Sequence, residues 1–287
     1  MSQTTLKFSS LAQLQDKLAE ILQSGPLYRR LNYTEEACHY VDNTRSAPLF
    51  GLLPRELHMF CSSKQCKKEQ RWTCESPKVY LQDEIKDREY ACNNCQGKSI
   101  YKYYLIWTGE KGKGSFTKVG QYPPLENTVP SVLEKQLGAT GIDYYRKALT
   151  CRNSSYGIGA LSYLRRVIED RMNDLLDLVI ETAKASEYEI DVSGIEEIKA
   201  SKRFDNKAEF AGKILPPHLK PGGHNPFDIL HDLFSEGVHS MTEEDCIDQF
   251  DKTKEAFEFL FKNMTLSKEE ATAYLQTLSN LAKKRKK

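Results

Sequence analysis

Two short cysteine pairs constrain the fold of this chain more than any other feature. The string "FCSSKQC" places Cys61 and Cys66 with four residues between them, and "YACNNCQGK" places Cys92 and Cys95 with two between them. Each spacing lets both thiolates of a pair face one turn, as a tetrahedral site with Zn–S distances of about 2.3 Å requires. The 25 residues between the pairs are enough for an intervening hairpin. The sequence therefore predicts a β module built around a structural Zn²⁺.

Other interpretations of the cysteines remain open at this point. Cys74 follows Cys66 by eight positions in "RWTCES", where it could be a packed thiol or could replace one of the four ligands. Cys92 and Cys95 could form a redox dithiol, or the cysteines could be buried thiols without a metal. Four disulfides are disfavoured, because the pairs lie in a long chain whose N-terminus shows no export signal. Four thiolates would leave no open coordination position, so such a zinc organises the fold and does not activate water.

The expected fold class is α+β, with an N-terminal zinc-ribbon-like antiparallel β module followed by an all-α helical bundle. Residues 1–48 are predicted as leading helices: Leu11, Leu14 and Leu18 recur at helical spacing up to "GP" at 25 and 26, and a second short helix begins at Thr34. Residues 49–122 alternate short apolar strands with Gly, Lys and Pro clusters. Prolines mark 123–130 as a linker, and 131–287 is predicted as the bundle with a basic tail.

The strongest helical pattern runs from about 156 to 184, with apolar residues every three or four positions. These residues are Leu161, Leu164, Ile168, Met172, Leu175 and Val179. Arg165 with Glu169 and Arg166 with Asp170 have the i,i+4 spacing of surface ion pairs, which is our first interpretation of these arginines.

Helix boundaries in the C-terminal half follow from capping residues. Asn225 before Pro226 predicts a helix start, and Gly237 predicts that this helix ends after Glu236. Thr242 with Asp245, and Ser267 with Glu270, have the capping-box spacing and predict two helices, at about 243–263 and 268–284.

Charge is balanced along the whole chain but not within the cysteine-bearing segment. The chain has 41 basic and 40 acidic residues, whereas residues 61–120 hold twelve basic and seven acidic ones. Basic residues interleaved with aromatic ones could grip a nucleic-acid strand by phosphate contact and base stacking. The candidate contacts are Lys67, Lys68, Arg71, Trp72 and Lys102. The alternative is that the aromatic side chains pack in a core while the lysines face solvent.

Two features bear on where the chain resides. No stretch approaches 18 uninterrupted apolar residues, so no membrane partner is expected and the predicted location is the cytoplasm. The five basic residues at 283–287 are either a solvated run or an electrostatic arm for phosphate backbones.

Several strings resemble a bacterial group that carries a domain of unknown function. They are "LHMFCSSKQC", "YACNNC", "FTKVGQYPP", "YGIGALSYLRRVIED" and "HDLFSEGVHSMTEEDC", and the similarity touches most of the chain from about 50 to 263. Members of this group have a zinc-ribbon-like module followed by a helical domain that resembles the HEPN superfamily (higher eukaryotes and prokaryotes nucleotide-binding). The resemblance implies an antiparallel helical bundle, often a homodimer, in a bacterial conflict or defence context.

Many HEPN proteins are ribonucleases that use an arginine and a histidine separated by four to six residues. Here that signature is missing. The positions before His231 hold Pro226, Asn225 and His224, and those before His239 hold Phe234, Leu233 and Asp232. An arginine from another helix, Arg165 or Arg166, could still approach His239 in space. A metal site and general acid–base catalysis at these histidines are alternatives to a simple helix end, where a cation suits the terminal carbonyls.

The sequence therefore favours a zinc-stabilised, non-enzymatic binding or regulatory protein with nucleic acid as a candidate ligand. A degenerate HEPN-type ribonuclease acting through His239 is the alternative from a different class. A structural partner of a neighbouring gene product is the third.

Overall fold

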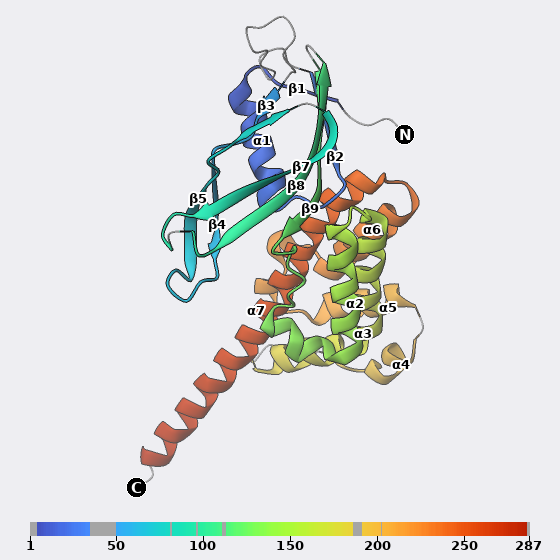
Figure 1. The fold of residues 1–287 in the computed structure, drawn as a ribbon. Coiled ribbons are helices and arrows are strands. Elements are labelled where there is room, and N and C mark those ends of the chain that lie inside the picture. Colours follow the sequence, from blue (N-terminus) through green and yellow to red (C-terminus); the bar gives the residue numbers. More distant parts are fainter. Residues whose placement is uncertain are drawn as a thin grey trace, which may run out of the picture. The chain divides into compact units, whose positions relative to one another are not determined.

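The computed structural model describes residues 5–34, 50–80, 82–95, 97–110, 113–185, 191–201 and 203–285 (Figure 1). By its internal contacts the chain divides into two compact units. The first comprises Met1–Glu126 with Asn153–Ser155, and the second comprises Asn127–Arg152 with Tyr156–Lys287. Each unit has its own buried apolar core.

The first unit is a curled seven-stranded sheet in the order β1-β2-β9-β8-β7-β5-β4 (Figure 1). The strands are β1 (Thr5–Lys7), β2 (Arg30–Thr34), β4 (Glu56–Cys61), β5 (Lys68–Thr73), β7 (Gln82–Cys92), β8 (Ile100–Glu110) and β9 (Lys113–Tyr122). β1 pairs with β2 in parallel, and the other neighbours are antiparallel. β3 (Phe50–Leu52) and β6 (Lys78–Tyr80) form a separate two-stranded sheet. The fold is mixed α and β as expected, but the sheet is too large and too curled for a small zinc ribbon.

Alternating side chains give the sheet an inner and an outer face. Along β4, Leu57, Met59 and Cys61 are buried while the residues between them are exposed. The helix α1 (Leu11–Gln23) contributes its buried face, including Leu14 and Leu18, to the same core as the inner face of the sheet. The buried residues recur at every second position on the strands and at helical spacing on α1, and together they form one hydrophobic core.

The leading segment differs in part from its prediction. The helix expected near residues 11–22 is confirmed as α1, with Ser10 Oγ accepting a hydrogen bond from the Gln13 N–H at 3.4 Å. The prediction of helices alone is wrong, because β1 and β2 flank α1 and extend the sheet. Thr34 is the last residue of β2, and the second leading helix would fall in residues 35–49, outside the described part of the chain.

The second unit is helical in the described residues. Its helices are α2 (Ser131–Asn153), α3 (Gly157–Ala185), α4 (Ile195–Ala200), α5 (Phe204–Ile214), α6 (Pro226–His239) and α7 (Glu243–Arg285), with short 3₁₀ turns at η2 (Pro217–Leu219) and η3 (Pro221–Gly223). The long helix α3 contacts α5, α6 and α7. Its predicted apolar face is confirmed, since all six residues of that face are buried. Within the described chain, no helix has the combination of length and apolar character that crossing a bilayer requires.

Two of the predicted caps are confirmed. Asn225 Oδ1 accepts from the Phe227 N–H at 3.1 Å at the start of α6, and Thr242 Oγ1 accepts from the Asp245 N–H at 3.2 Å at the start of α7. Each cap satisfies an N–H group that has no partner inside the helix.

Two predicted boundaries are wrong. α6 continues through Gly237 to His239, because one glycine inside a helix costs only about 1 kcal/mol, which is less than the burial of Phe227, Leu230 and Phe234 on the same helix contributes. α7 runs without a break from Glu243 to Arg285, so Ser267 does not open a new helix. No glycine or proline lies between residues 243 and 285, and a capping-box spacing alone does not interrupt a continuous helix.

Candidate metal centre

Two neighbouring hairpin tips bring four cysteines together. Cys61 ends β4 and Cys66 lies in the loop before β5, whereas Cys92 ends β7 and Cys95 lies in the loop before β8. The two hairpins are adjacent in the sheet because β5 pairs with β7, with Trp72 opposite Cys92. The four sulfur atoms all lie within 4.8 Å of one another. The sheet topology therefore gathers thiols that lie far apart along the chain.

Backbone hydrogen bonds shape the first loop. The N–H groups of Cys66 and Lys67 donate to the Ser63 carbonyl at 2.9 and 3.1 Å. Lys67 has a positive φ of 44°, a conformation that few non-glycine residues adopt. This tight reversal turns Cys66 back toward Cys61.

The second loop closes in a similar way. The Gly97 N–H donates to the Cys92 carbonyl at 3.2 Å, and the Lys98 N–H donates to the Cys95 carbonyl at 3.2 Å. Gly97 has φ +76°, which glycine adopts without steric cost. The Cys92 N–H donates to the Ser99 carbonyl at 3.1 Å and fixes the base of the loop.

The sulfur geometry fits a metal site and excludes a disulfide bond between Cys66 and Cys92. Cys66 Sγ and Cys92 Sγ are 3.9 Å apart, whereas a disulfide bond is about 2.05 Å long. Four sulfurs at about 2.3 Å from a tetrahedral zinc lie about 3.8 Å from one another, close to the observed separation. All four side chains are largely withdrawn from solvent. The arrangement can hold a metal ion with four sulfur ligands.

Two polar side chains form hydrogen bonds with the cysteine sulfurs. Asn94 Nδ2 donates to Cys66 Sγ at 3.1 Å, and the Cys61 thiol donates to Ser99 Oγ at 3.5 Å. Hydrogen bonding from Ser99 lowers the pKa of Cys95 to about 7, while burial raises the pKa of Cys92 to about 12. Buried thiols resist collective ionisation because the thiolates repel one another, and a divalent cation among them removes that penalty.

Cys74 is not one of the four grouped cysteines. It is buried just after β5, where its backbone N–H donates to the Arg55 carbonyl at 2.9 Å, and burial raises the pKa of its thiol. Its surroundings match the packed-thiol interpretation.

Trp72 is part of the core and not a surface aromatic. Its side chain is 1% exposed, and its Nε1–H donates to the Met59 carbonyl at 2.9 Å. Its ring meets Tyr101 edge-on with centroids 4.9 Å apart. No face of the indole is available to a base, so the prediction that Trp72 contacts nucleic acid is wrong.

The basic candidates divide into paired and exposed groups. Lys102 Nζ lies 2.8 Å from Asp87 and 3.2 Å from Glu89, which neutralise it on the outer face of the sheet. Arg71 is exposed and lies 3.6 Å from Glu56. Lys67 and Lys68 are exposed beside the cysteine cluster.

Sequence reasoning missed two further lysines and an aromatic residue near the same sulfurs. Lys64, Lys98 and Phe60 are exposed within three positions of a cysteine. Their closeness to the cysteine pairs along the chain was the signal that could have identified them.

The histidine candidates stay predictions. His239 is the last residue of α6, but the side chains of His231 and His239 lie outside the described residues. Arg165 Nε donates to Glu169 at 2.7 Å, as its spacing predicts. Asp170 forms an ion pair with Arg171 at 3.5 Å. The predicted ion pair between Arg166 and Asp170 is therefore replaced by the pair with Arg171.

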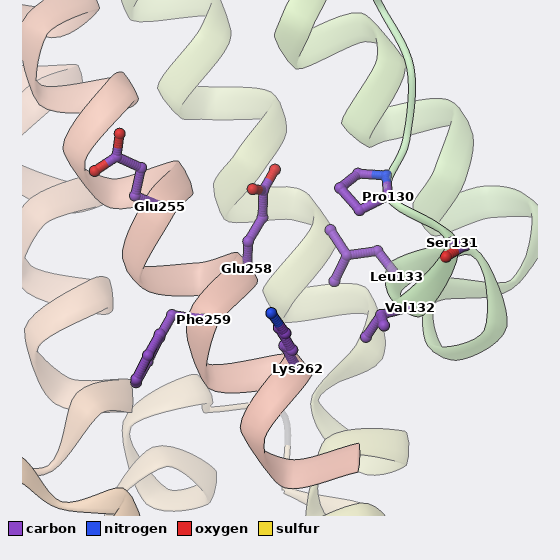
Figure 2. Close-up of a pocket in the computed structure, with 8 residues that line it drawn as sticks. All are labelled: Pro130, Ser131, Val132, Leu133, Glu255, Glu258, Phe259 and Lys262. Atoms are coloured by element: carbon purple, nitrogen blue, oxygen red, sulfur yellow. The ribbon is translucent and has the colours of Figure 1, made fainter. Parts of the chain in front are cut away.

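A separate pocket of about 300 Å³ lies in the helical unit, between the start of α2 and the middle of α7 (Figure 2). Figure 2 shows Pro130 and Leu133 on one side, and Glu258 and Lys262 on the other. Glu258 accepts hydrogen bonds from Lys254 at 3.2 Å and from the Tyr145 hydroxyl. The Tyr145 contact joins α2 to α7, so this carboxylate is engaged in packing. None of the candidate site residues that the sequence predicted lines this pocket.

Comparison with known proteins found no match to this chain among protein-family models, curated proteins or solved structures.

Proposed function

We propose that Cys61, Cys66, Cys92 and Cys95 bind a structural Zn²⁺ and that the protein acts by binding a partner and not by catalysis. The observation that carries this proposal is the grouping of four largely buried cysteine sulfurs within 4.8 Å. Soft thiolate ligands in a tetrahedral set are typical of zinc and of iron–sulfur centres. A redox dithiol needs only two thiols, so a convergence of four favours a metal.

The donor set supports a structural role for the metal. Zinc supplies a stable tetrahedral link between four thiolates, and a fourth protein ligand leaves no position for water or substrate. Asn94 Nδ2 would orient the sulfur of Cys66 through the hydrogen bond already described, and the Ser99 hydroxyl, which accepts from the Cys61 thiol without metal, would donate to a thiolate once the cysteines ionise. This chain then contributes a rigid pair of hairpin tips, without an activated water molecule.

The link would join parts of the sheet that share few direct hydrogen bonds. β5 and β7 register only at Trp72 opposite Cys92 and at Thr73 opposite Ala91. Two thiolates from each hairpin would hold β4 and β5 against β7 and β8 beyond this short seam. The metal would thereby fix the relative position of the two loops that it bridges.

Metal analysis tests the proposal directly. Protein purified without metal-chelating resin is analysed by plasma mass spectrometry, with an expected content of about one Zn²⁺ per chain. Cys92→Ser is expected to lose the metal, whereas Cys74→Ser, the matched buried cysteine, is expected to keep it.

Cobalt replacement reports the ligand set independently of folding. Co²⁺ bound to tetrahedral thiolates is expected to show strong ultraviolet charge-transfer and visible bands, and these should vanish in Cys92→Ser. Stoichiometric iron in place of zinc would contradict the choice of metal. A purified protein that contains no metal and takes up neither Zn²⁺ nor Co²⁺ when these are added would contradict the site itself.

A further inference from the structure

Four exposed lysines surround the proposed metal centre. Lys64 lies two positions before Cys66, Lys67 and Lys68 follow it directly, and Lys98 lies three positions after Cys95. All four side chains are exposed. Within the described part of the chain none of them forms an ion pair, unlike Lys102 on the same sheet. These residues are hereafter the tip lysines.

The loops that carry the tip lysines contain no acidic residue. Residues 62–67 and 93–99 hold neither aspartate nor glutamate, and Glu69 on β5 is the first carboxylate after Lys68. A zinc ion with four thiolates carries a formal charge of about −2, which can offset two of the four lysine charges. A positive excess remains at the surface, where a ligand with several negative charges complements it.

Exposed apolar side chains flank the two cysteine-bearing loops along the chain, and the cross-strand partner of Phe60 is Glu69. Phe60, the residue before Cys61, is 51% exposed, and Ile100, the residue after Ser99, is 42% exposed. An aromatic face beside a cluster of cations is the combination that binds a base and its phosphates together. Duplex DNA or RNA keeps its base faces stacked inside the helix, whereas a single strand presents them.

We propose that the two hairpin tips bind single-stranded nucleic acid, with phosphates on the tip lysines and a base stacked on Phe60. This inference rests on the proposed metal centre, because the metal holds the two loops in one surface. The interface differs from the one that sequence alone predicts. Trp72 is buried and Lys102 is neutralised, while Lys64, Lys98 and Phe60 take their places.

Fluorescence anisotropy of the full, zinc-loaded chain with labelled 15-nucleotide single strands tests the inference. DNA and RNA strands of the same mixed sequence form separate arms, and the matching duplex forms a third. Four phosphate contacts predict that log affinity falls with log salt with a slope of about −2.8, or about 50-fold between 50 and 200 mM salt. Single strands are expected to bind more tightly than the duplex.

Two variants separate the contributions. Changing all four tip lysines to glutamine is expected to abolish the salt-dependent binding, and Phe60→Ala is expected to weaken single-strand binding by at least about fivefold. The matched control changes four exposed lysines of the helical unit to glutamine and is expected to leave the affinity unchanged. These control residues are Lys135, Lys213, Lys252 and Lys262. Zinc content is measured for every variant, so that a lost metal is distinguished from a lost contact.

Several results would overturn the inference. If the zinc-loaded protein binds neither single strand, the metal centre stands and the nucleic-acid surface is wrong. If the tip-lysine variant binds normally while deletion of residues 283–287 abolishes binding, the basic tail is the contact. If the duplex binds as tightly as the single strands, the stacking role of Phe60 is wrong. If the purified chain lacks zinc, the metal proposal fails first, and the inference fails with it.

Discussion

Removal of the proposed Zn²⁺ is expected to destabilise the β-sheet unit by an amount that the chain connectivity sets. The shortest link between the two cysteine pairs joins Cys66 to Cys92, which encloses a segment of 27 residues. By the chain-entropy expression for cross-links, closing a loop of this length contributes about 3.5 kcal/mol to the free energy of unfolding. A metal clip restrains the unfolded chain as a disulfide does, provided that it stays bound there.

Tryptophan fluorescence reports this effect in the unit concerned. The chain has two tryptophans, and Trp72 and Trp107 are both buried in the core of the sheet. With a urea m-value of about 1–3 kcal/mol/M, the loss of about 3.5 kcal/mol lowers the midpoint by about 1.2–3.5 M. Urea titrations of zinc-loaded and chelator-treated protein therefore measure the prediction.

The control and the refuting result are both accessible. Cys151→Ser, in the helical unit, changes a free thiol far from the four ligands along the chain and should leave the metal-dependent shift intact. An unchanged fluorescence midpoint after verified zinc removal would refute the reasoning, because the two hairpins would then be held together without the metal. A shift that persists in Cys92→Ser after chelation would refute it equally.

Three further predictions concern packing and backbone geometry. Trp72→Phe removes the hydrogen bond to the buried Met59 carbonyl and should cost about 1–3 kcal/mol in urea unfolding, while anisotropy should show unchanged affinity for single strands. Thr242→Ala removes the N-terminal cap of α7 and should cost about 1 kcal/mol, seen as a lower thermal midpoint by circular dichroism; an unchanged midpoint would contradict the capping role. Gly138→Ala, at the kink in α2 where φ is +59°, should destabilise by about 1–3 kcal/mol, although alanine normally stabilises a helix interior, because the added Cβ would lie 2.7 Å from Arg171 Nη2. A stabilised Gly138→Ala protein would show that α2 straightens at this point.

The spacing of apolar residues predicts the buried faces of helices correctly in this chain. Capping residues predict where a helix starts. The apolar face of α3 was predicted because residues three and four positions apart share one side of a helix. The start of α6 follows from Asn225, because its side chain accepts from a helix N–H that has no partner inside the helix. The prediction that this helix ends at Gly237 is wrong, because the low helix propensity of a single glycine is too small to end a helix that packs along its length.

The sequence did not predict which strands pair with one another. β1 and β2 are short and precede the rest of the sheet by many residues, so their pairing in a seven-stranded sheet depends on contacts distant in the chain. For the same reason the module was expected to be a small ribbon. Strand propensity describes a half-buried pleated surface, but it does not say which strands share that surface.

The sequence by itself determined the four thiols, the order of a β-rich half before a helical half, and the core face of α3, because each depends on spacing between nearby residues. Only the tertiary structure decided that the four sulfurs converge, that Trp72 lies inside, and that Phe60 lies outside. A strand pattern places Trp72 and Phe60 on faces of their strands but leaves open which face is buried. Burial is decided by α1 packing on one side of the sheet, a contact between segments that local spacing cannot encode.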